Sequence, residues 1–279
     1  MPMTAPSPPL AVSSWSLHRT LGLTFPNRPD HDVATPTPQP TYGEGRISLL
    51  DMPELVRGLG IDRVEICSFH IANRDPVYLA ELRAALAASG ITLQTLLVEY
   101  GDITNPATAE RDLAWIGRWI ETAAELGAEQ ARVIAGKAKH SAETLGRSVV
   151  GLRRLARQGE TLGVRIVTEN WFDFLSTPAE VHSLFYRLDG AVGLNGDFGN
   201  WSGPGKYEDL KAIFRIAICC HAKGDFSDGQ LDEEDYANCL AAATAAGFRG
   251  PYTLIYDGSD PDEIANLAIE RDFIRNYFA

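Results

Sequence analysis

The sequence lacks any long hydrophobic run, although apolar residues make up 45% of it. No segment approaches the roughly 20 consecutive apolar residues that a membrane-spanning helix needs, so we expect no membrane partner. Residues 1–9 also lack the basic stretch followed by an apolar stretch that marks a signal peptide. Because these residues are rich in proline, we expect a flexible N-terminal arm, followed by one domain that spans residues 10–279.

Cysteine is scarce, and none of the four cysteines forms a C-x-x-C pair. The absence of that spacing gives no support to a redox site. Cys67, Cys219 and Cys220 fall on or beside predicted strands, where a small apolar side chain packs well. We therefore expect reduced, structural thiols in a cytoplasmic protein.

Positive charge is scarce as well, with 25 Lys and Arg against 37 Asp and Glu, which gives a formal net charge of -12. Nucleic-acid affinity rests on clustered Lys and Arg, and the sequence has no basic stripe, so we expect no nucleic-acid partner. The sequence also has no G-x-S-x-G motif and no H-E-x-x-H motif. Their absence gives no support to a serine hydrolase or a zincin.

What the sequence does contain is a repeated alternation of short apolar strands with longer amphipathic helices. The predicted strands are Leu10–Trp15, Arg63–Cys67, Thr92–Val98, Ala131–Ala135, Val164–Glu169, Ala191–Asp197, Ile216–His221 and Tyr252–Tyr256. The predicted helices are Ser48–Leu59, Pro76–Ser89, Pro106–Leu126, Ala142–Leu162, Pro178–Arg187, Tyr207–Phe214, Asp232–Ala246 and Pro261–Tyr277. Strict alternation implies a parallel sheet, and eight such units are the number that closes a barrel.

We therefore predict an α/β fold, a single-domain (β/α)8 TIM barrel. The length of 279 residues is close to the about 250 typical of that fold. A doubly wound open sheet is the competing fold, but no Gly-rich phosphate-binding fingerprint follows the first strand. One connection, from His18 to Arg46, is long and has no clear periodicity. Since it follows the first strand, it is either a lid over the barrel mouth or a disordered decoration.

Three strands that are neighbours in a barrel end in residues that bind metals. Glu169 follows the apolar run of the fifth strand, Asp197 ends the sixth and His221 ends the seventh. The carboxyl ends of parallel strands meet at one mouth of the barrel, so the three side chains can converge there. Two carboxylates and an imidazole suit a divalent cation, with Mn2+ favoured and Mg2+, Zn2+ or Fe2+ also suitable. The alternative is that each residue is merely a solvated strand end.

Further polar and aromatic residues lie close to these strand ends. Lys223 follows His221 by two residues, so on an extended strand it points to the same side and could stabilise an oxyanion or form a salt bridge. Trp171 and Trp201 could stack on a sugar face or pack at the rim. The remaining candidates for substrate binding are Asn200, His70 and Glu99. Weaker candidates are His18 and Lys137, and for Glu65 we expect a structural ion pair across the barrel.

The order of these motifs resembles the xylose isomerase-like TIM-barrel superfamily of sugar isomerases and epimerases. The resemblance runs from about Leu10 onward. The motifs that carry it are Gly60–Ile66, Leu126–Ala128, Glu169–Asn170, Asp197–Asn200 and His221–Lys223. In that family the fifth-strand Glu, the sixth-strand Asp and the seventh-strand His bind a divalent cation, so the resemblance implies the same role for Glu169, Asp197 and His221.

The sequence departs from the family pattern at two positions. The family has a fourth ligand, a Glu on the last strand, where this chain has Ile255; Asp257 or water would have to take its place. In the family's epimerases the two opposing glutamates also form the acid–base pair, so this change argues against a two-base mechanism. Asn200 stands where a variant of the sixth-strand motif has a histidine, which predicts different substrate contacts.

These observations predict a metal-dependent isomerase or epimerase that removes a proton next to the carbonyl of a sugar or a related polyol or keto compound. Glu169 is the expected proton-transfer group and Lys223 the expected electrophile or alternate acid. Two alternatives remain: a dehydratase or lyase on the same substrate class, and a non-catalytic sugar-binding barrel that has lost the eighth-strand Glu. The sequence leaves the oligomeric state open, a homo-oligomer included.

Overall fold

A computed structural model describes residues 7–279, so most of the arm predicted for residues 1–9 lies outside the described residues. Eight parallel strands close into a barrel in the order β1-β10-β7-β6-β5-β4-β3-β2. They are β1 (Leu10–Ser13), β2 (Arg63–Cys67), β3 (Thr92–Leu97), β4 (Gln130–Arg132), β5 (Arg165–Glu169), β6 (Gly193–Asp197), β7 (Ala217–Lys223) and β10 (Tyr252–Ile255). The predicted (β/α)8 barrel is confirmed.

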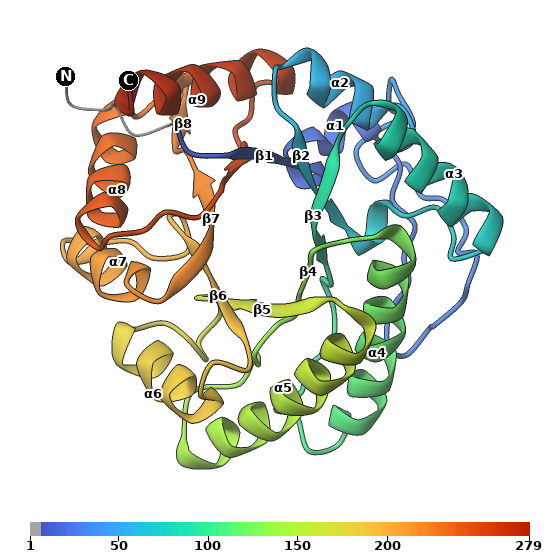
Figure 1. Cartoon of the computed structure of the whole chain (residues 1–279), viewed down its shortest axis with the longest axis vertical. Helices are drawn as coiled ribbons and strands as arrows, with labels where there is room; N and C mark the ends of the chain where they lie inside the picture. The colour runs from blue at the N-terminus through green and yellow to red at the C-terminus, as the bar shows by residue number, and fades with distance from the viewer. Residues whose placement is uncertain (1–6) are drawn as a thin grey trace.

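Helices surround the ring of strands and cover its outer face (Figure 1). The α-helices are α1 (His18–Leu21), α2 (Met52–Gly58), α3 (Pro76–Ala88), α4 (Ala109–Leu126), α5 (Ala142–Leu162), α6 (Pro178–Leu188), α7 (Lys206–Phe214), α8 (Glu233–Ala245) and α9 (Glu263–Tyr277). The structure also contains two 3-10 helices, η1 (Ser14–Leu17) and η2 (Ser68–His70). A short hairpin pairs β8 (Phe226–Ser227) with β9 (Gln230–Leu231). No helix among residues 7–279 is long and apolar enough to cross a membrane.

The strand predictions were wrong mainly at their carboxyl ends. The first strand stops at Ser13, because the Ser13 side chain accepts a hydrogen bond from the Trp15 backbone N–H and caps η1. The fourth strand is Gln130–Arg132 rather than Ala131–Ala135. Its ladder ends where its neighbour ends, since Arg132 pairs with Leu97, the last residue of β3.

Local signals at the ends of α5 explain how β5 is placed. Ser141 and Thr144 form a capping box at the start of the helix. Gly163 closes it with φ 74°, a left-handed conformation that glycine adopts without a steric penalty. The chain then reverses directly into β5, so the helix end fixes where Glu169 emerges at the barrel mouth.

The long segment after β1 packs against the barrel and its helices. The indole N–H of Trp115 in α4 donates to Asn27 Oδ1 over 2.6 Å. The ring of Tyr42 lies 4.3 Å from that of His18 and 6.3 Å from that of Trp15. These contacts argue against a disordered decoration and place part of the segment beside the first strand's carboxyl end; its role as a lid stays a prediction.

Candidate metal centre

The three strand-terminal residues meet at the carboxyl ends of β5, β6 and β7, which are neighbours in the barrel. Asp197 and His221 are partners in the register of β6 and β7. A β-bulge makes this pairing possible: Leu194 pairs with Ala217 and Asn195 with Cys219, so Ile218 is an extra residue in β7. Bulges re-aim the side chains that follow them. The bulge thus brings the imidazole level with the carboxylate.

The geometry of the three side chains suits a divalent cation. His221 Nδ1 lies 3.5 Å from Glu169 Oε2 and 3.5 Å from Asp197 Oδ2, and all three ligand atoms lie within 4.8 Å of one another. Distances of 3.5 Å are long for hydrogen bonds, whereas a cation between atoms so spaced would lie at ordinary ligand distances from each. Glu169 Oε2 is buried and makes no hydrogen bond within residues 7–279. This orphaned oxygen fits a metal ligand.

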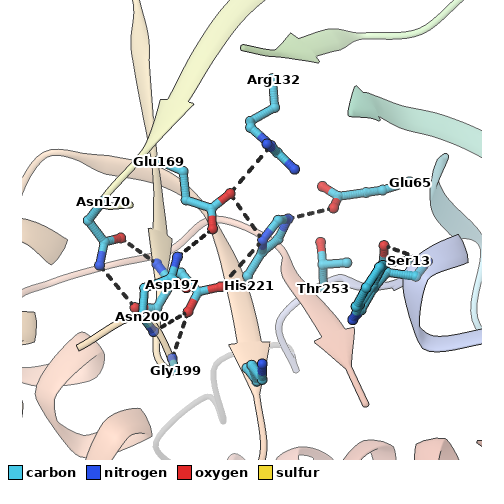
Figure 2. Close-up of polar contacts among 12 residues, drawn as sticks. Ser13, Glu65, Arg132, Glu169, Asn170, Asp197, Gly199, Asn200, His221 and Thr253 are labelled. Atoms are coloured by element: carbon cyan, nitrogen blue, oxygen red, sulfur yellow. Dashed lines mark hydrogen bonds and ion pairs between the residues drawn. The ribbon is translucent and has the colours of Figure 1, made fainter. Parts of the chain in front are cut away.

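The other oxygen of each carboxylate is held in place by neighbouring donors (Figure 2). The side-chain amide of Asn200 donates to Glu169 Oε1 over 2.7 Å. The backbone N–H groups of Gly199 and Asn200 donate to Asp197 Oδ1 over 2.6 and 2.8 Å. Asn170 in turn binds the backbone of Asp197, accepting from its N–H over 2.7 Å and donating to its C=O over 3.2 Å. Both carboxylates are therefore fixed with one oxygen left for a ligand.

The imidazole is held in the same way from the barrel interior. Its Nε2 lies 2.8 Å from Oε2 of Glu65, which projects from β2 and is 1% exposed. Gln94 and Thr95 donate to the other carboxylate oxygen, Oε1 of Glu65, over 3.0 and 2.8 Å. The ion pair expected for Glu65 therefore exists, and its partner is His221, whose Nδ1 is left facing the two carboxylates.

The charges of the cluster are strongly coupled. Burial opposes ionisation of Glu169, but the charges of His221 and Arg132 lower its pKa to about 2. Burial and the charge of Glu169 raise the pKa of Asp197. For His221 burial opposes protonation, yet the carboxylates of Glu169 and Glu65 raise its pKa well above its ordinary value. Without a cation, the cluster therefore holds a proton on the imidazole.

These residues line a cavity of about 220 Å³ at the barrel mouth. Its lining is Ser13, Trp15, Leu97, Glu99, Arg132, Glu169, Trp171, Asp197, Asn200, His221, Lys223, Ile255 and Asp257. Lys223 Nζ donates to Asp257 Oδ2 over 2.8 Å. Ile255, the last residue of β10, is 6% exposed, so the eighth barrel strand ends in an apolar side chain in this cavity.

The structure brings only some of the predicted substrate-binding residues into this cavity. Asn200, Trp171 and Glu99 line it. Trp201 is buried elsewhere, and its indole N–H donates to the C=O of Leu175 over 3.1 Å. His70 lines a separate cavity of about 450 Å³, to which residues of the long segment after β1 also contribute.

Sequence reasoning missed four residues that line the cavity, Ser13, Trp15, Leu97 and Arg132, of which only Arg132 of β4 is charged. Its Nη2 donates to Glu99 Oε1 over 2.7 Å, and its Nε lies 3.4 Å from Glu169 Oε2. The guanidinium carbon also lies 5.1 Å from the centre of the Trp171 ring. The available signal was a charged residue inside an apolar strand.

Solved structures similar to this one share its fold over nearly the whole chain. A xylose isomerase-like TIM barrel protein from Mycobacterium smegmatis in complex with magnesium has a TM-score of 0.70 at 19% identity, over 100% of this chain and 98% of that one. D-allulose 3-epimerase from Methylomonas sp. has a TM-score of 0.71 at 15% identity, over 99% and 100%. At this identity the likeness shows the fold alone.

A third similar structure, 3-keto-D-glucoside 4-epimerase from E. coli in its apo form, has a TM-score of 0.65 at 19% identity, over 81% of this chain and 94% of that one. No curated protein matches the chain. The family model described as xylose isomerase-like TIM barrel matches residues 53–277, which is most of the sequence. The chain therefore belongs to the xylose isomerase-like TIM barrel family.

Proposed function

We propose that the protein is a divalent-metal-dependent isomerase or epimerase that removes a proton next to the carbonyl of a sugar or a related polyhydroxylated compound. The observation that carries this proposal is the convergence of Glu169, Asp197 and His221 at the barrel mouth. Three similar structures support it by their names, two as sugar epimerases and one as a magnesium complex. The cluster would hold Mn2+ by preference, and Mg2+, Zn2+ or Fe2+ also suit its donors.

Glu169, Asp197 and His221 would share the task of holding the ion, and Glu169 would also act as the base. Bound by Glu169, Asp197 and His221, a divalent ion would polarise the carbonyl and lower the pKa of the neighbouring C–H. Glu169 is ionised at neutral pH, so it can accept the substrate proton. Asn200 holds Glu169 Oε1 and so orients the carboxylate toward the cavity.

Lys223, two residues after His221 on β7, supplies a further positive group to the same cavity. Burial opposes its charge, but the hydrogen bond to Asp257 raises the pKa of Lys223 above its ordinary value. The ammonium therefore stays charged at neutral pH and acts as an electrophile toward a developing enolate oxygen rather than as a base. Asp257 holds the ammonium in position.

The apolar end of β10 favours a second candidate, a dehydratase or lyase on the same substrate class. An epimerase that works with two bases needs a proton donor on each face of the substrate, and Ile255 provides none on the eighth strand. Elimination of water needs one base for the C–H and one acid for the leaving hydroxyl. Glu169 and the Lys223–Asp257 pair can fill those two roles.

Two measurements test the proposal. Protein purified without chelator should contain stoichiometric metal, and the Mn2+-loaded protein should exchange a ketose proton for deuterium in D2O, detected by NMR with D-fructose, D-allulose and L-ribulose. Glu169→Gln should abolish the exchange. New sugar signals would indicate an isomerase or epimerase, and an unsaturated or dehydrated product would indicate the lyase. Absence of both metal and exchange would support a non-catalytic binding barrel instead.

A further inference from the structure

Arg132 occupies an unusual place for an arginine, inside the barrel mouth. It projects from β4 toward Glu169, as Figure 2 shows, and its side chain is only 4% exposed. Arginine keeps its charge in proteins, so burying it costs free energy unless its N–H groups find acceptors. A residue that carries this cost inside a ligand-sized cavity is a candidate for ligand binding.

The guanidinium is only partly satisfied by the protein. Nη2 donates to Glu99, but Nη1 and Nε are buried and make no hydrogen bond within residues 7–279. Nε lies 3.4 Å from Glu169 Oε2, and His221 also faces this oxygen. A buried donor left without an acceptor destabilises the protein, because it has lost its hydrogen bonds to water.

The surroundings restrict what can approach these donors. The guanidinium carbon lies over the ring of Trp171, and the N–H groups point outward in the plane of the guanidinium, so an acceptor must come to its edge. Across the cavity, Lys223 is already paired with Asp257, and Ile255 brings no charge. Among the described residues that line the cavity, Arg132 is therefore the cation whose buried donor nitrogens lack an acceptor.

A carboxylate is the ligand group that fits such an edge best. It offers two oxygens in one plane, which can accept from Nη1 and from the second N–H of Nη2, and its charge strengthens the hydrogen bonds about twofold over neutral ones. A hydroxyl oxygen could accept a hydrogen bond from Nη1, but it would contribute neither the second oxygen nor the charge.

We propose that Arg132 binds a carboxylate of the substrate, so that the substrate is a sugar acid or a polyhydroxylated keto acid rather than a neutral sugar. This inference rests on the proposed function for the identity of the cavity as the substrate site. It assigns Arg132 to specificity, with Glu99 and Trp171 as the residues that position the guanidinium.

The test is a binding measurement with two probes that differ in one group. D-arabinonate carries a carboxylate where D-arabinitol carries a hydroxymethyl group, and calorimetry on the Mn2+-loaded protein gives a dissociation constant for each. We expect the acid to bind at least about tenfold more tightly than the alcohol, because a charged bidentate contact replaces a neutral one. In Arg132→Gln this preference should fall to about one.

Two further variants make the result decisive. Arg132→Lys keeps the charge without the planar fork, so it should retain only a small part of the preference, and it decides the matter if Arg132→Gln does not fold. Arg63→Gln is the matched control, because Arg63 pairs with Glu129 at the opposite end of the barrel and should leave the preference unchanged. Equal binding of the two probes by the wild type, or an undiminished preference in both Arg132 variants, would overturn the inference.

This outcome is separate from that of the proposed function. Binding preference is measured without turnover, whereas deuterium exchange reports proton removal. Exchange on neutral ketoses combined with equal binding of the two probes would leave the proposed function standing and remove the carboxylate assignment. A preference for the acid that depends on Arg132, with no exchange on any keto compound, would support the carboxylate assignment and contradict the proposed proton removal.

Discussion

Glu65 Oε2 lies 2.8 Å from Nε2 of His221, across the interior of the barrel from β2 to β7. A histidine that binds metal through one ring nitrogen commonly donates from the other to a carboxylate, which fixes its tautomer and raises its basicity. We therefore expect Glu65 to be a positioning residue: with a metal bound, it would direct the lone pair of Nδ1 toward the ion between Glu169 and Asp197.

Glu65→Gln should weaken Mn2+ binding by about 10- to 100-fold. Gln94 and Thr95 donate to Oε1 of Glu65, so a glutamine there must turn its oxygen toward them and its NH2 group toward His221. Nε2 must then accept a hydrogen bond, which moves the imidazole proton to Nδ1 and blocks the metal-binding nitrogen. Calorimetric titration with Mn2+ measures the change. Glu129→Gln, on the barrel surface, is the control, and equal affinity in both variants would contradict the tautomer argument.

Mn2+ binding should release a proton and strengthen as pH rises. The carboxylates around His221 hold its pKa well above its ordinary value in the metal-free protein, so the imidazole must lose a proton before it can coordinate. Below that pKa the affinity should fall about tenfold for each unit of pH lost. Calorimetry in buffers of different ionisation enthalpy measures the proton count; binding without proton release would rule out a protonated His221 in the metal-free state.

Asp197→Ala should abolish stoichiometric metal uptake and leave the barrel folded. The substitution removes one ligand oxygen and also the acceptor of the Gly199 and Asn200 backbone N–H groups, which should cost about 1–3 kcal/mol of stability. Metal content by mass spectrometry and the circular dichroism spectrum are the two measurements. Asp173→Ala, an exposed position after β5, is the control. Unchanged metal content in the Asp197 variant would remove the basis for the proposed site.

Lys223→Met should lower the deuterium-exchange rate by about 100-fold while metal content stays the same, since a single charge-stabilising donor has about this effect. The methionine keeps much of the side-chain volume but cannot stabilise a negative oxygen. Lys211→Met on α7 is the control, because its partner is the exposed Glu208 at the outer surface. A parallel loss of metal in Lys223→Met would show that the ammonium supports the cluster rather than the reaction.

The strand-end pattern made the barrel and the meeting of Glu169, Asp197 and His221 predictable from sequence. Long periodic segments specify which elements form, and parallel strands present their carboxyl ends at one mouth. The roles of these residues as metal ligands stay predictions.

The remaining features of the site depend on contacts that sequence does not encode locally. Arg132 lies in a short strand, and its pairing with Glu99 and Glu169 depends on the strand neighbours. Trp201 turns away from the cavity because its indole N–H finds the C=O of Leu175, a partner set by the loop conformation. The bulge at Ile218, which aligns His221 with its partner strand, has no local sequence signal that we recognised.

Glu270 of α9 should make the protein less stable at alkaline pH. It is fully buried, its Oε1 accepts a hydrogen bond from the Gly224 backbone N–H over 3.1 Å, and its Oε2 makes none among residues 7–279. Burial raises the pKa of Glu270 to about 8. Since the folded state holds this proton more tightly than the unfolded chain, its contribution is fully present below the unfolded pKa of about 4.3 and is lost as pH rises toward about 8.

Glu270→Gln removes this dependence, because an amide is neutral at every pH and its oxygen can still accept from Gly224. The variant should therefore gain stability relative to the wild type as pH rises from about 5 to about 8. At about 1.4 kcal/mol for each unit of pKa difference, the gain amounts to a few kcal/mol. Urea unfolding across this pH range measures it, with the exposed Glu234→Gln of α8 as the control. A constant difference between Glu270→Gln and the wild type across the range would mean that this carboxyl stays ionised in the fold, and that the positive charge of nearby Lys223 outweighs its burial.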